Sequence, residues 1–403
     1  MKKPNLVFLS GILANTIDHY DVAIYALLAP FLARVFFKES DPAVALILTY
    51  SLTSLGIFTR PIGAFLFGRM AIDKGPKPTL IIILVGITLS TIAMGLIPGY
   101  ASIGPYAAVL LAILRMIQGL FAAGELSVAC MFFLEQQNDK KLGRASSFYS
   151  CGAMLGIGIA SIAATIVSNT SNPEYYWRYA FFSSSLMAIP TLGLRFFIKT
   201  PQIPKQQKTS SLRVISTNRW KLLSVILVSS LSYVTYAVPF VFMNSFVPYI
   251  LPITNAEMLE YNSLLTIFDV GLILIFGIFV DRFPHHKWMA LFAGLVALTA
   301  IPLFYLLPEA SLLGVNLIRA WIVILGVAYS APLKAWFFKL IDSDEKYLIT
   351  GLGYTIGSEL LGRNTTVICW SLFYYFQSPL APAFYIASIA LCACVVLLVD
   401  LRT

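Results

Sequence analysis

Charged side chains are scarce in this sequence of 403 residues. Only 12% of the residues are charged and 58% are hydrophobic, whereas about 25% of the residues of a soluble domain are charged. The mean hydropathy is +0.81. This composition excludes a water-soluble globular fold, because most of the chain must be surrounded by lipid or by other apolar segments.

Histidine and cysteine are also few. The three histidines are His19, His285 and His286, and the five cysteines lie in apolar runs without the spacing of metal ligands. Neither a metal centre nor a disulfide framework is therefore expected. The sequence also lacks motifs that cradle phosphate or supply a nucleophile, which argues against an enzyme embedded in the membrane.

Long apolar runs fill most of the chain. A helix needs about 20 residues to cross the hydrocarbon core of a bilayer, and the sequence contains twelve runs of suitable length. These runs lie near residues 6–33, 44–67, 79–97, 105–134, 146–168, 179–198, 222–250, 258–280, 288–307, 312–338, 350–376 and 381–400. We therefore expect an all-α polytopic membrane protein with twelve transmembrane helices and no room for a soluble signalling domain. The first run follows Lys2 and Lys3 without a cleavage site, so we expect it to be retained as a span.

Lysine and arginine indicate the orientation of the chain. Positively charged residues are retained on the cytoplasmic side, and an N-terminus inside places most of the 28 lysines and arginines, Arg195 among them, in cytoplasmic segments. The outside loops then carry only Arg34, Lys38 and Arg178. We expect a multi-pass protein of the cell inner (plasma) membrane with both termini in the cytoplasm. The net charge of +9 then faces anionic lipid and requires no nucleic acid.

The chain divides into two related halves. A polar stretch at 199–221 follows the sixth span and is expected to be a cytoplasmic linker between an N-terminal half, 1–198, and a C-terminal half, 222–403. Arg115 in the fourth span recurs as Arg319 in the tenth. Two pseudo-symmetric six-helix bundles around a central site are typical of secondary transporters.

Five segments are informative because of the order in which they occur. They are Asn15-Thr-Ile-Asp18-His19-Tyr20-Asp21 with Tyr25 in span one, Arg60-Pro61-Ile-Gly63 in span two, Arg115-Met-Ile-Gln118-Gly119 with Gly124-Glu125 in span four, Trp177-Arg178 at span six and Thr350-Gly351-Leu-Gly353-Tyr354 at span eleven. In this order they resemble the major facilitator superfamily, and within it the metabolite:proton symporter branch of proline/betaine, citrate and 2-oxoglutarate carriers. The resemblance covers nearly the whole chain and implies the major facilitator fold and alternating access.

The loop after the second span departs from the superfamily pattern. An acid in that loop normally caps a neighbouring helix and holds one end-state, but aligning the glycines of the pattern puts Ile72 at the position of the acid and Asp73 at that of the base. A similar segment follows the eighth span. The candidate gating residues are therefore Gly68, Asp73, Asp281 and Arg282, and we expect the contact of the first loop to be shifted or weakened.

Nine ionisable residues besides His19 lie within the expected spans. Each costs about 2.5–3.5 kcal/mol at the centre of a membrane helix, so we expect all of them to face the protein interior and to find partners. They are Asp18, Asp21, Arg60, Arg115, Glu125, Asp269, Arg319, Glu359 and Arg363. A structural ion pair is the alternative to a functional role for each of them. Glu359 and Arg363, four residues apart, favour a local pair, and Asp269 with Arg319 is an open case.

The first half supplies the proton-coupling candidates. Asp18 and Asp21 lie three residues apart on span one, and two buried acids so close repel each other when both are charged, which favours proton uptake. On span four, Arg115 and Glu125 lie in one hemisphere of the helix, where the arginine can act on the acid or bind a substrate carboxylate. The superfamily resemblance also implies a role of this arginine in coupling. The substrate-binding candidates are Asn15, Tyr25, Arg60, Arg115, Gln118, Asp269 and Arg319.

These observations favour a secondary active transporter. We expect proton-coupled symport of an anionic or zwitterionic metabolite, such as an organic acid, an amino acid or a betaine-type osmolyte, with the proton as coupling ion and no other cofactor. An exporter of a siderophore or metabolite and a facilitator without coupling remain open alternatives. The expected partners are the small-molecule substrate and membrane lipid, with no protein partner implied.

Overall fold

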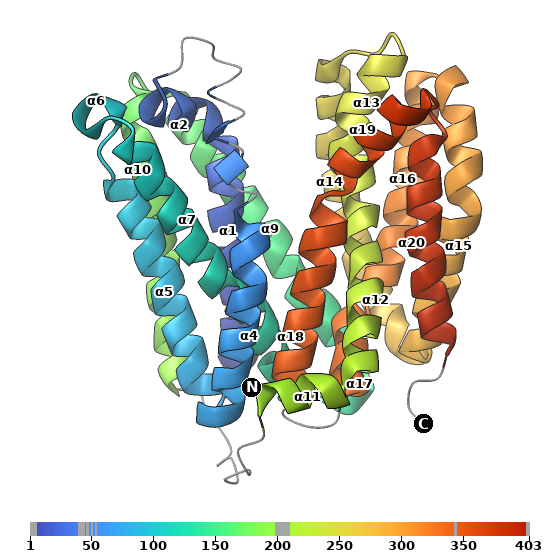
Figure 1. Ribbon diagram of the computed structural model, residues 1–403, viewed down its shortest axis with the longest axis horizontal. Coiled ribbons are helices and arrows are strands. Elements are labelled where there is room, and N and C mark those ends of the chain that lie inside the picture. The colour runs from blue at the N-terminus through green and yellow to red at the C-terminus, as the bar shows by residue number, and fades with distance from the viewer. Residues whose placement is uncertain are drawn as a thin grey trace. The chain divides into compact units, whose positions relative to one another are not determined.

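The computed structural model describes residues 6–38, 45, 48–49, 51–52, 55–197, 210–341 and 345–399. Within these residues every regular element is a helix (Figure 1), which confirms the all-α prediction. Nine helical segments of the described part are long and apolar enough to cross a membrane, or up to ten if one bent pair is a single span. Part of the expected second span, and residues 199–209 of the expected linker, lie outside the described residues.

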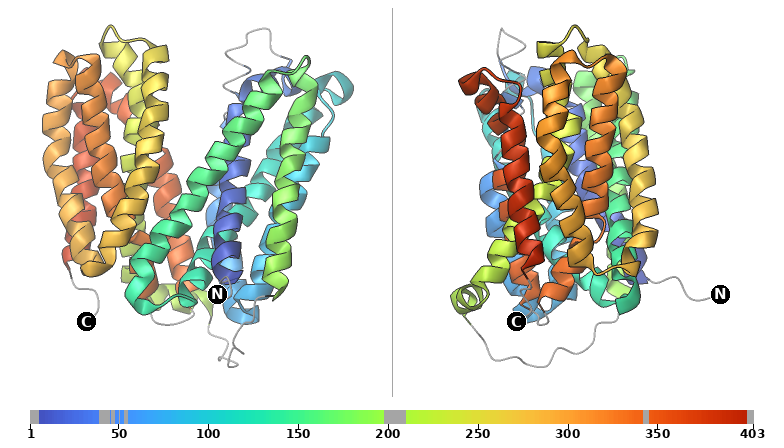
Figure 2. Two further views of the ribbon diagram at one scale, coloured as in Figure 1. Left: turned by 180° about the vertical axis from the view of Figure 1, so that it is seen from behind. Right: turned by 90° about the vertical axis from the view of Figure 1, so that its right-hand side faces the viewer.

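The helices form two compact units. The first unit spans Met1–Gln136 and Tyr149–Ser211, and the second spans Gln137–Phe148 and Leu212–Thr403. Within each unit the long helices run side by side in all views (Figures 1 and 2). The exact division of the chain at the expected linker stays a prediction.

Each unit contains both long helices and short ones. The first unit holds α1 (Leu6–Leu27), α2 (Ala29–Phe36), α4 (Gly56–Lys74), α5 (Pro76–Leu96), α6 (Tyr100–Ile103), α7 (Tyr106–Gly124), the π-helix η1 (Glu125–Ala129), α8 (Cys130–Glu135), α9 (Leu142–Ser168) from Tyr149 onward, and α10 (Pro173–Phe197). The second unit holds η2 (Asp139–Lys141), the start of α9, α11 (Ser211–Thr217), α12 (Arg219–Ala237), the π-helix η3 (Val238–Phe242), α13 (Met243–Ile250), α14 (Asn255–Phe279), η4 (Val280–Arg282), α15 (His285–Leu306), η5 (Leu307–Glu309), α16 (Leu312–Ser330), α17 (Leu333–Leu340), α18 (Lys346–Ile356), the π-helix η6 (Gly357–Arg363), α19 (Thr365–Phe376) and α20 (Ala381–Leu398).

Proline bends the first expected span. The helices α1 and α2 meet at Leu28 with an angle of 64°, and Pro30 lies in the first turn of α2. Proline has no backbone N–H to donate and its ring clashes with the preceding turn, so a helix breaks or kinks just before it. The run expected at 6–33 is therefore a bent pair of helices that continues to Phe36.

Glycine allows α9 to approach α1 closely. A Cβ atom at Gly156 would lie 2.3 Å from the carbonyl oxygen of Thr16, and one at Gly152 would lie 2.7 Å from the carbonyl oxygen of Ile12. In the described part of the chain, no atom outside the neighbouring backbone of α9 lies within 4 Å of a Cβ built at Gly158. Two glycines of the segment thus serve the close helix contact, and the third faces open space.

Aromatic side chains fill much of the second unit. Phe242 and Phe246 are fully buried and stack on each other with ring centroids 4.7 Å apart, and both rings also contact Trp370 edge-on. These two phenylalanines of span seven therefore pack in the core. Tyr236 differs, because it is 37% exposed while its ring stacks on Phe240 at 5.0 Å.

Candidate functional site

A chain of polar contacts links three helices of the first unit. Thr91 Oγ1 on α5 donates to Asp21 Oδ2 on α1 at 2.9 Å, and Gln118 Nε2 on α7 donates to the same threonine hydroxyl at 2.7 Å. Arg115 Nη1 donates to Gln118 Oε1 at 2.6 Å, and the Arg115 guanidinium carbon lies 3.9 Å from the centroid of the Tyr25 ring. The structure therefore brings together Tyr25, Arg115, Gln118 and Asp21, which the sequence had singled out.

This contact chain is shielded from solvent. Asp21 is 2% exposed, Arg115 8% and Gln118 5%. Asp21 Oδ1 has no hydrogen-bond partner among the described residues. The Ser184 hydroxyl lies close to this carboxylate but makes no hydrogen bond of normal geometry to it. An incompletely bonded oxygen on a buried carboxylate is unusual for a group whose sole purpose is structural.

Asn15 and Asp18 make other contacts on the same helix. Asn15 Nδ2 donates to the backbone carbonyl of Tyr149 on α9 at 2.7 Å, and its own carbonyl lies 2.9 Å from His19 Nδ1. Asp18 Oδ2 lies 3.8 Å from the same histidine nitrogen. The polar stripe expected on span one is thus divided, because Asn15 joins two helices while Asp21 belongs to the contact chain.

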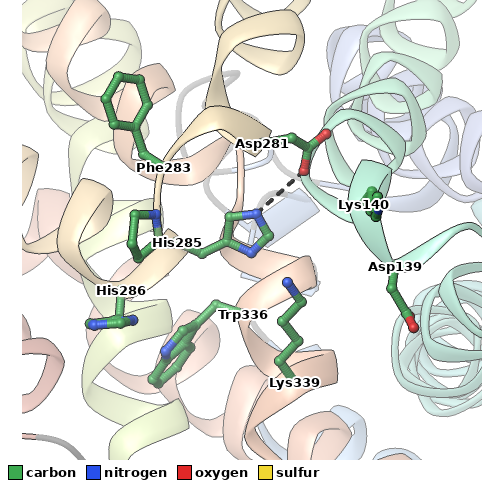
Figure 3. Close-up of a pocket in the computed structure, with 9 residues that line it drawn as sticks. Asp139, Lys140, Asp281, Phe283, His285, His286, Trp336 and Lys339 are labelled. Carbon is green, nitrogen blue, oxygen red and sulfur yellow. Dashed lines mark hydrogen bonds and ion pairs between the residues drawn. The ribbon is translucent and has the colours of Figure 1, made fainter.

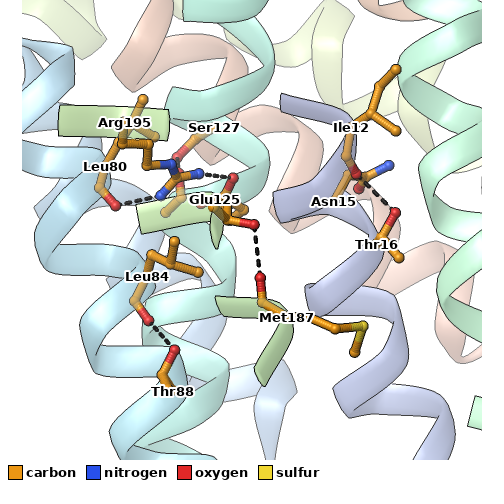
Figure 4. A network of polar contacts seen from close by, with 12 residues as sticks. Ile12, Asn15, Thr16, Leu80, Leu84, Thr88, Glu125, Ser127, Met187 and Arg195 are labelled. Carbon is orange, nitrogen blue, oxygen red and sulfur yellow. Dashed lines mark hydrogen bonds and ion pairs between the residues drawn. The ribbon is translucent and has the colours of Figure 1, made fainter. Parts of the chain in front are cut away.

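Glu125 pairs with an arginine that the sequence placed elsewhere. Arg195 Nη2 on α10 donates to Glu125 Oε1 at 2.5 Å, and Nη1 donates to the Leu80 carbonyl at 2.5 Å (Figure 4). The two side chains are 1% and 2% exposed. The assignment of Arg195 to a cytoplasmic segment was therefore wrong. The apolar run at 179–198 already contained this residue, which was a usable sign of burial.

Arg115 is not the partner of Glu125. Ten residues separate them, which corresponds to about 15 Å along a helix, and Arg115 bonds to Gln118 whereas Glu125 bonds to Arg195. Glu125 also begins the π-helix η1, and π turns occur frequently at functional sites. Arg115 therefore does not act directly on Glu125 as expected, because the two residues belong to separate groups of contacts.

Arg60 lies at the contact of α4 with α7. It is 8% exposed. A Cβ atom at Gly119 would lie 3.8 Å from Arg60 Cγ, and one at Gly56 would lie 3.5 Å from Arg60 Nε. The side chain of Arg60 thus lies in the space that Gly56 and Gly119 leave free because they have no side chains.

Arg319 in the second unit is fully buried and surrounded by neutral oxygens. Its Nε donates to the Pro239 carbonyl at 3.0 Å, a group of the π-helix η3. Its two terminal nitrogens donate to oxygens of Asn244 at 2.9 Å, Asn262 at 2.5 Å, Asn316 at 3.1 Å and Met258 at 3.4 Å. A guanidinium has five N–H donors, and these contacts occupy all five. The geometry favours a structural role for Arg319.

Asp269 on α14 has neither a hydrogen bond nor an ion pair among the residues that the structure describes, although it is only 6% exposed. The ion pair with Arg319 that was an open alternative is not formed. Leu265, one turn before Asp269, packs with Phe240 in an apolar cluster. Tyr236 lies one turn before Phe240 and stacks on it. Leu265 and Phe240 pack together, and Asp269 and Tyr236 each lie one helical turn from this pair. Asp269 and Tyr236 therefore lie at a similar depth in the second unit.

Glu359 and Arg363 form the local pair that their spacing predicts. Arg363 Nε lies 3.1 Å from Glu359 Oε2 within the π-helix η6. The Arg363 guanidinium carbon lies 5.9 Å from the Tyr233 ring, and this ring contacts Tyr236. The prediction of a structural pair in span eleven is confirmed.

The candidate gating acids have different partners. Asp73 Oδ2 accepts a hydrogen bond at 2.8 Å from Arg69 Nε one turn earlier on α4, close to the buried Gly68. This acid therefore has a partner on its own helix and lies in the last turn of α4, whereas the sequence had placed it in a loop after the second span.

Asp281 instead caps the start of α9. Its two oxygens accept hydrogen bonds from the backbone N–H groups of Gly143 at 2.7 Å and Arg144 at 2.9 Å, which lie in the first turn of that helix. The neighbouring Arg282 lies over the Phe279 ring at 4.9 Å. A carboxylate at a helix N-terminus is favourable because of the unpaired N–H groups and the helix dipole.

Comparison with known proteins decides the family. The sequence profile described as Major Facilitator Superfamily matches residues 11–362. The chain belongs to the major facilitator superfamily. It is therefore a membrane transporter rather than an enzyme, with a small-molecule substrate and a lipid environment.

Individual relatives lie at low sequence identity. The proline/betaine transporter of Salmonella typhimurium is 28% identical, over 94% of this chain and 79% of the relative. The alpha-ketoglutarate permease of Escherichia coli is 23% identical, over 89% of this chain and 85% of the relative. The solved structure of the proton:xylose symporter XylE superposes with a TM-score of 0.73 at 15% identity, over 97% of this chain and 94% of that one. This last likeness shows the major facilitator fold.

Proposed function

We propose that this transporter is a proton-coupled symporter for a small polar metabolite and that Asp21 carries the proton. The observation that supports this proposal is the contact chain from Arg115 to Asp21. One carboxylate oxygen of Asp21 accepts from Thr91, and the other makes no hydrogen bond of normal geometry in the described structure, although the Ser184 hydroxyl lies close enough to interact with this carboxylate. A proton can therefore bind at the second oxygen without breaking the hydrogen bond from Thr91.

Arg115 connects proton uptake to substrate binding in this proposal. Its guanidinium reaches Asp21 through Gln118 and Thr91, so the charge of the carboxylate affects the whole chain of hydrogen bonds. When Asp21 is protonated, the positive charge of Arg115 is less compensated. A substrate carboxylate is then bound more strongly, because charge-assisted contacts to arginine are the strong ones.

Asp269 supports a substrate that also carries a positively charged nitrogen. A buried carboxylate needs a cation, a proton or donors, and the described residues supply none to Asp269. Arg319 cannot bind a substrate carboxylate without giving up one of its five contacts. The face of the stacked Tyr236 and Phe240 rings can attract a cation. The second unit therefore favours an ammonium group.

An amino acid or a betaine-type osmolyte has this chemistry. The names of the Salmonella relative's substrates, proline and betaine, denote molecules with a carboxylate and a positively charged nitrogen, whereas the permease relative is named for a dicarboxylate. We place the transporter in the inner membrane with both termini in the cytoplasm, because its lysines and arginines are distributed in that way.

Uptake into proteoliposomes tests proton coupling. An inward proton gradient should accelerate accumulation of radiolabelled proline or glycine betaine, and an uncoupler should abolish this effect. Asp21→Asn should lose gradient-driven accumulation but retain exchange of substrate. Glu174→Gln is the matched control, because Glu174 is an exposed acid whose pair with Arg34 is 3.5 Å long. If uptake by the wild type does not depend on the proton gradient, the protein is a facilitator and not a symporter.

A binding screen tests the substrate class separately. Thermal unfolding of the purified protein should be shifted upward by proline or glycine betaine and less by succinate or 2-oxoglutarate. Asp269→Asn should weaken the apparent affinity for the ammonium compounds at least tenfold, as measured by the concentration needed to shift thermal unfolding. A shift by the dicarboxylates alone would contradict the proposed class while leaving the coupling experiment intact.

A further inference from the structure

A pocket of about 490 Å³ lies in the second unit where η2, η4, the start of α15 and α17 meet (Figure 3). All the residues that line it belong to this unit. The contact chain of the proposed transport site contributes none of them. The pocket therefore provides a place for a ligand other than the transported substrate.

One of the two acids that line this pocket, Asp281, already has hydrogen-bond partners. Asp281 accepts hydrogen bonds from the Gly143 and Arg144 backbone amides, and His285 Nε2 lies 3.4 Å from its Oδ1. Its negative charge is compensated by the N-terminus of α9 and by these donors. It therefore opposes the binding of an anion less than a free carboxylate would.

His285 has an unused nitrogen that faces the pocket. The residue is 6% exposed, and its Nδ1 has no hydrogen-bond partner among the described residues. Figure 3 shows this edge of the ring directed toward Lys339, on the side opposite to the contact with Asp281. A buried polar atom without a partner is costly, so a ligand that accepts a hydrogen bond here would remove that cost.

Two lysines complete the lining. Lys140 of η2 and Lys339 of α17 both line the pocket, and neither ammonium group has an ion-pair partner in the described part of the chain. The other titratable groups that line it are His286 and Asp139. In Figure 3 the Asp139 carboxylate points away from His285. The lining around His285 thus includes two lysine ammonium groups, while one of its two acids is engaged and the other points away.

We propose that this pocket binds a phosphate-type oxyanion through His285, Lys339 and Lys140. The imidazolium of His285 would donate from Nδ1 to the anion and from Nε2 to Asp281, while the lysines supply charge. The phosphate group can come from a soluble molecule or from the headgroup of an anionic lipid. In either case the bound anion holds η2 to α17 and so stabilises the start of α9.

Thermal unfolding of the purified full chain tests this site. Inorganic phosphate, added at constant ionic strength against chloride, should raise the unfolding midpoint of the wild type in a saturable way. Lys339→Gln and His285→Gln should weaken the apparent affinity at least tenfold. Lys287→Gln is the matched control, because Lys287 is an exposed lysine near the same loop that does not line the pocket.

The source of the phosphate group is tested in nanodiscs. Protection by phosphatidylglycerol but not by phosphatidylcholine, lost in Lys339→Gln, would indicate a lipid headgroup, and protection by inorganic phosphate in both membranes would indicate a soluble ligand. Either result supports the site. Equal protection of the wild type and Lys339→Gln, or no protection from either source, would overturn it, and neither outcome bears on proton coupling at Asp21.

Discussion

Arg195 Nη2 and Glu125 Oε1 form an ion pair of 2.5 Å between α10 and the π-helix that follows α7, and both side chains are almost entirely buried. Arg195 also donates to the Leu80 carbonyl on α5. One arginine thus connects three helices of the first unit. A pair in this position joins helices, and its removal should affect stability first.

Glu125→Gln is therefore expected to destabilise the protein. Removing one partner of a buried pair leaves an uncompensated charge and costs about 3–5 kcal/mol. The measurement is the thermal unfolding midpoint in detergent, with Glu135→Gln as control because Glu135 lies near the end of the same span and is half-buried. Replacing both Glu125 and Arg195 by methionine should recover most of the loss. A single variant as stable as the wild type would show that the pair contributes nothing.

Arg115→Lys should impair transport more than folding. Lysine keeps the charge but loses the planar fork that contacts Gln118 and lies over the Tyr25 ring, and such a substitution is not conservative at a stacked site. We expect uptake of a carboxylate-bearing substrate to fall at least tenfold while the unfolding midpoint stays close to that of the wild type. An equal loss for a neutral analogue would assign Arg115 to structure alone.

The fold could be predicted from the sequence because insertion into a membrane imposes long apolar helices. The local pair of Glu359 with Arg363 was predictable for a similar reason, since one helical turn fixes its geometry. The bend before α2 follows from the chemistry of Pro30. Each of these features depends on residues that are close in sequence.

Contacts between helices that are far apart in the sequence could not be predicted. Arg195 was assigned to the cytoplasm because a count of lysine and arginine cannot distinguish a residue inside the last turns of a span from one beyond it. Thr91 gave no signal, because a threonine in a membrane helix commonly bonds to its own backbone. Here the single hydroxyl proton of Thr91 is shared between Asp21 Oδ2 at 2.9 Å and the Ile87 carbonyl oxygen at 3.0 Å. The neutral oxygens around Arg319 come from separate helices, whose facing sides depend on packing.

The capping box at the start of α14 should give a small pH-dependent contribution to stability. The backbone N–H and the hydroxyl of Thr254 donate to the Glu257 carboxylate, and these hydrogen bonds lower the pKa of Glu257. A lowered folded-state pKa means that the contribution is present above the ordinary glutamate value of about 4.3 and is lost as the pH falls through the folded-state pKa. Glu257→Gln should therefore lower stability slightly at pH 7 and not at pH 3. Thermal unfolding at the two pH values measures this, and an identical difference at both would contradict it.

Two glycines on α9 allow a matched test of helix packing. Gly156→Ala would place a Cβ atom 2.3 Å from the Thr16 carbonyl oxygen of α1, a backbone atom that cannot move aside cheaply. Gly158→Ala meets no atom of another described element within 4 Å. Overpacking of this kind typically costs about 1–3 kcal/mol, while alanine in an open helical position is favoured over glycine by about 1 kcal/mol. We expect the unfolding midpoint of Gly156→Ala to fall by several degrees and that of Gly158→Ala to stay equal or rise. Because α1 carries Asp21, Gly156→Ala should also reduce proton-driven uptake. If both variants unfold at the same temperature, the close approach of α9 to α1 does not contribute to stability.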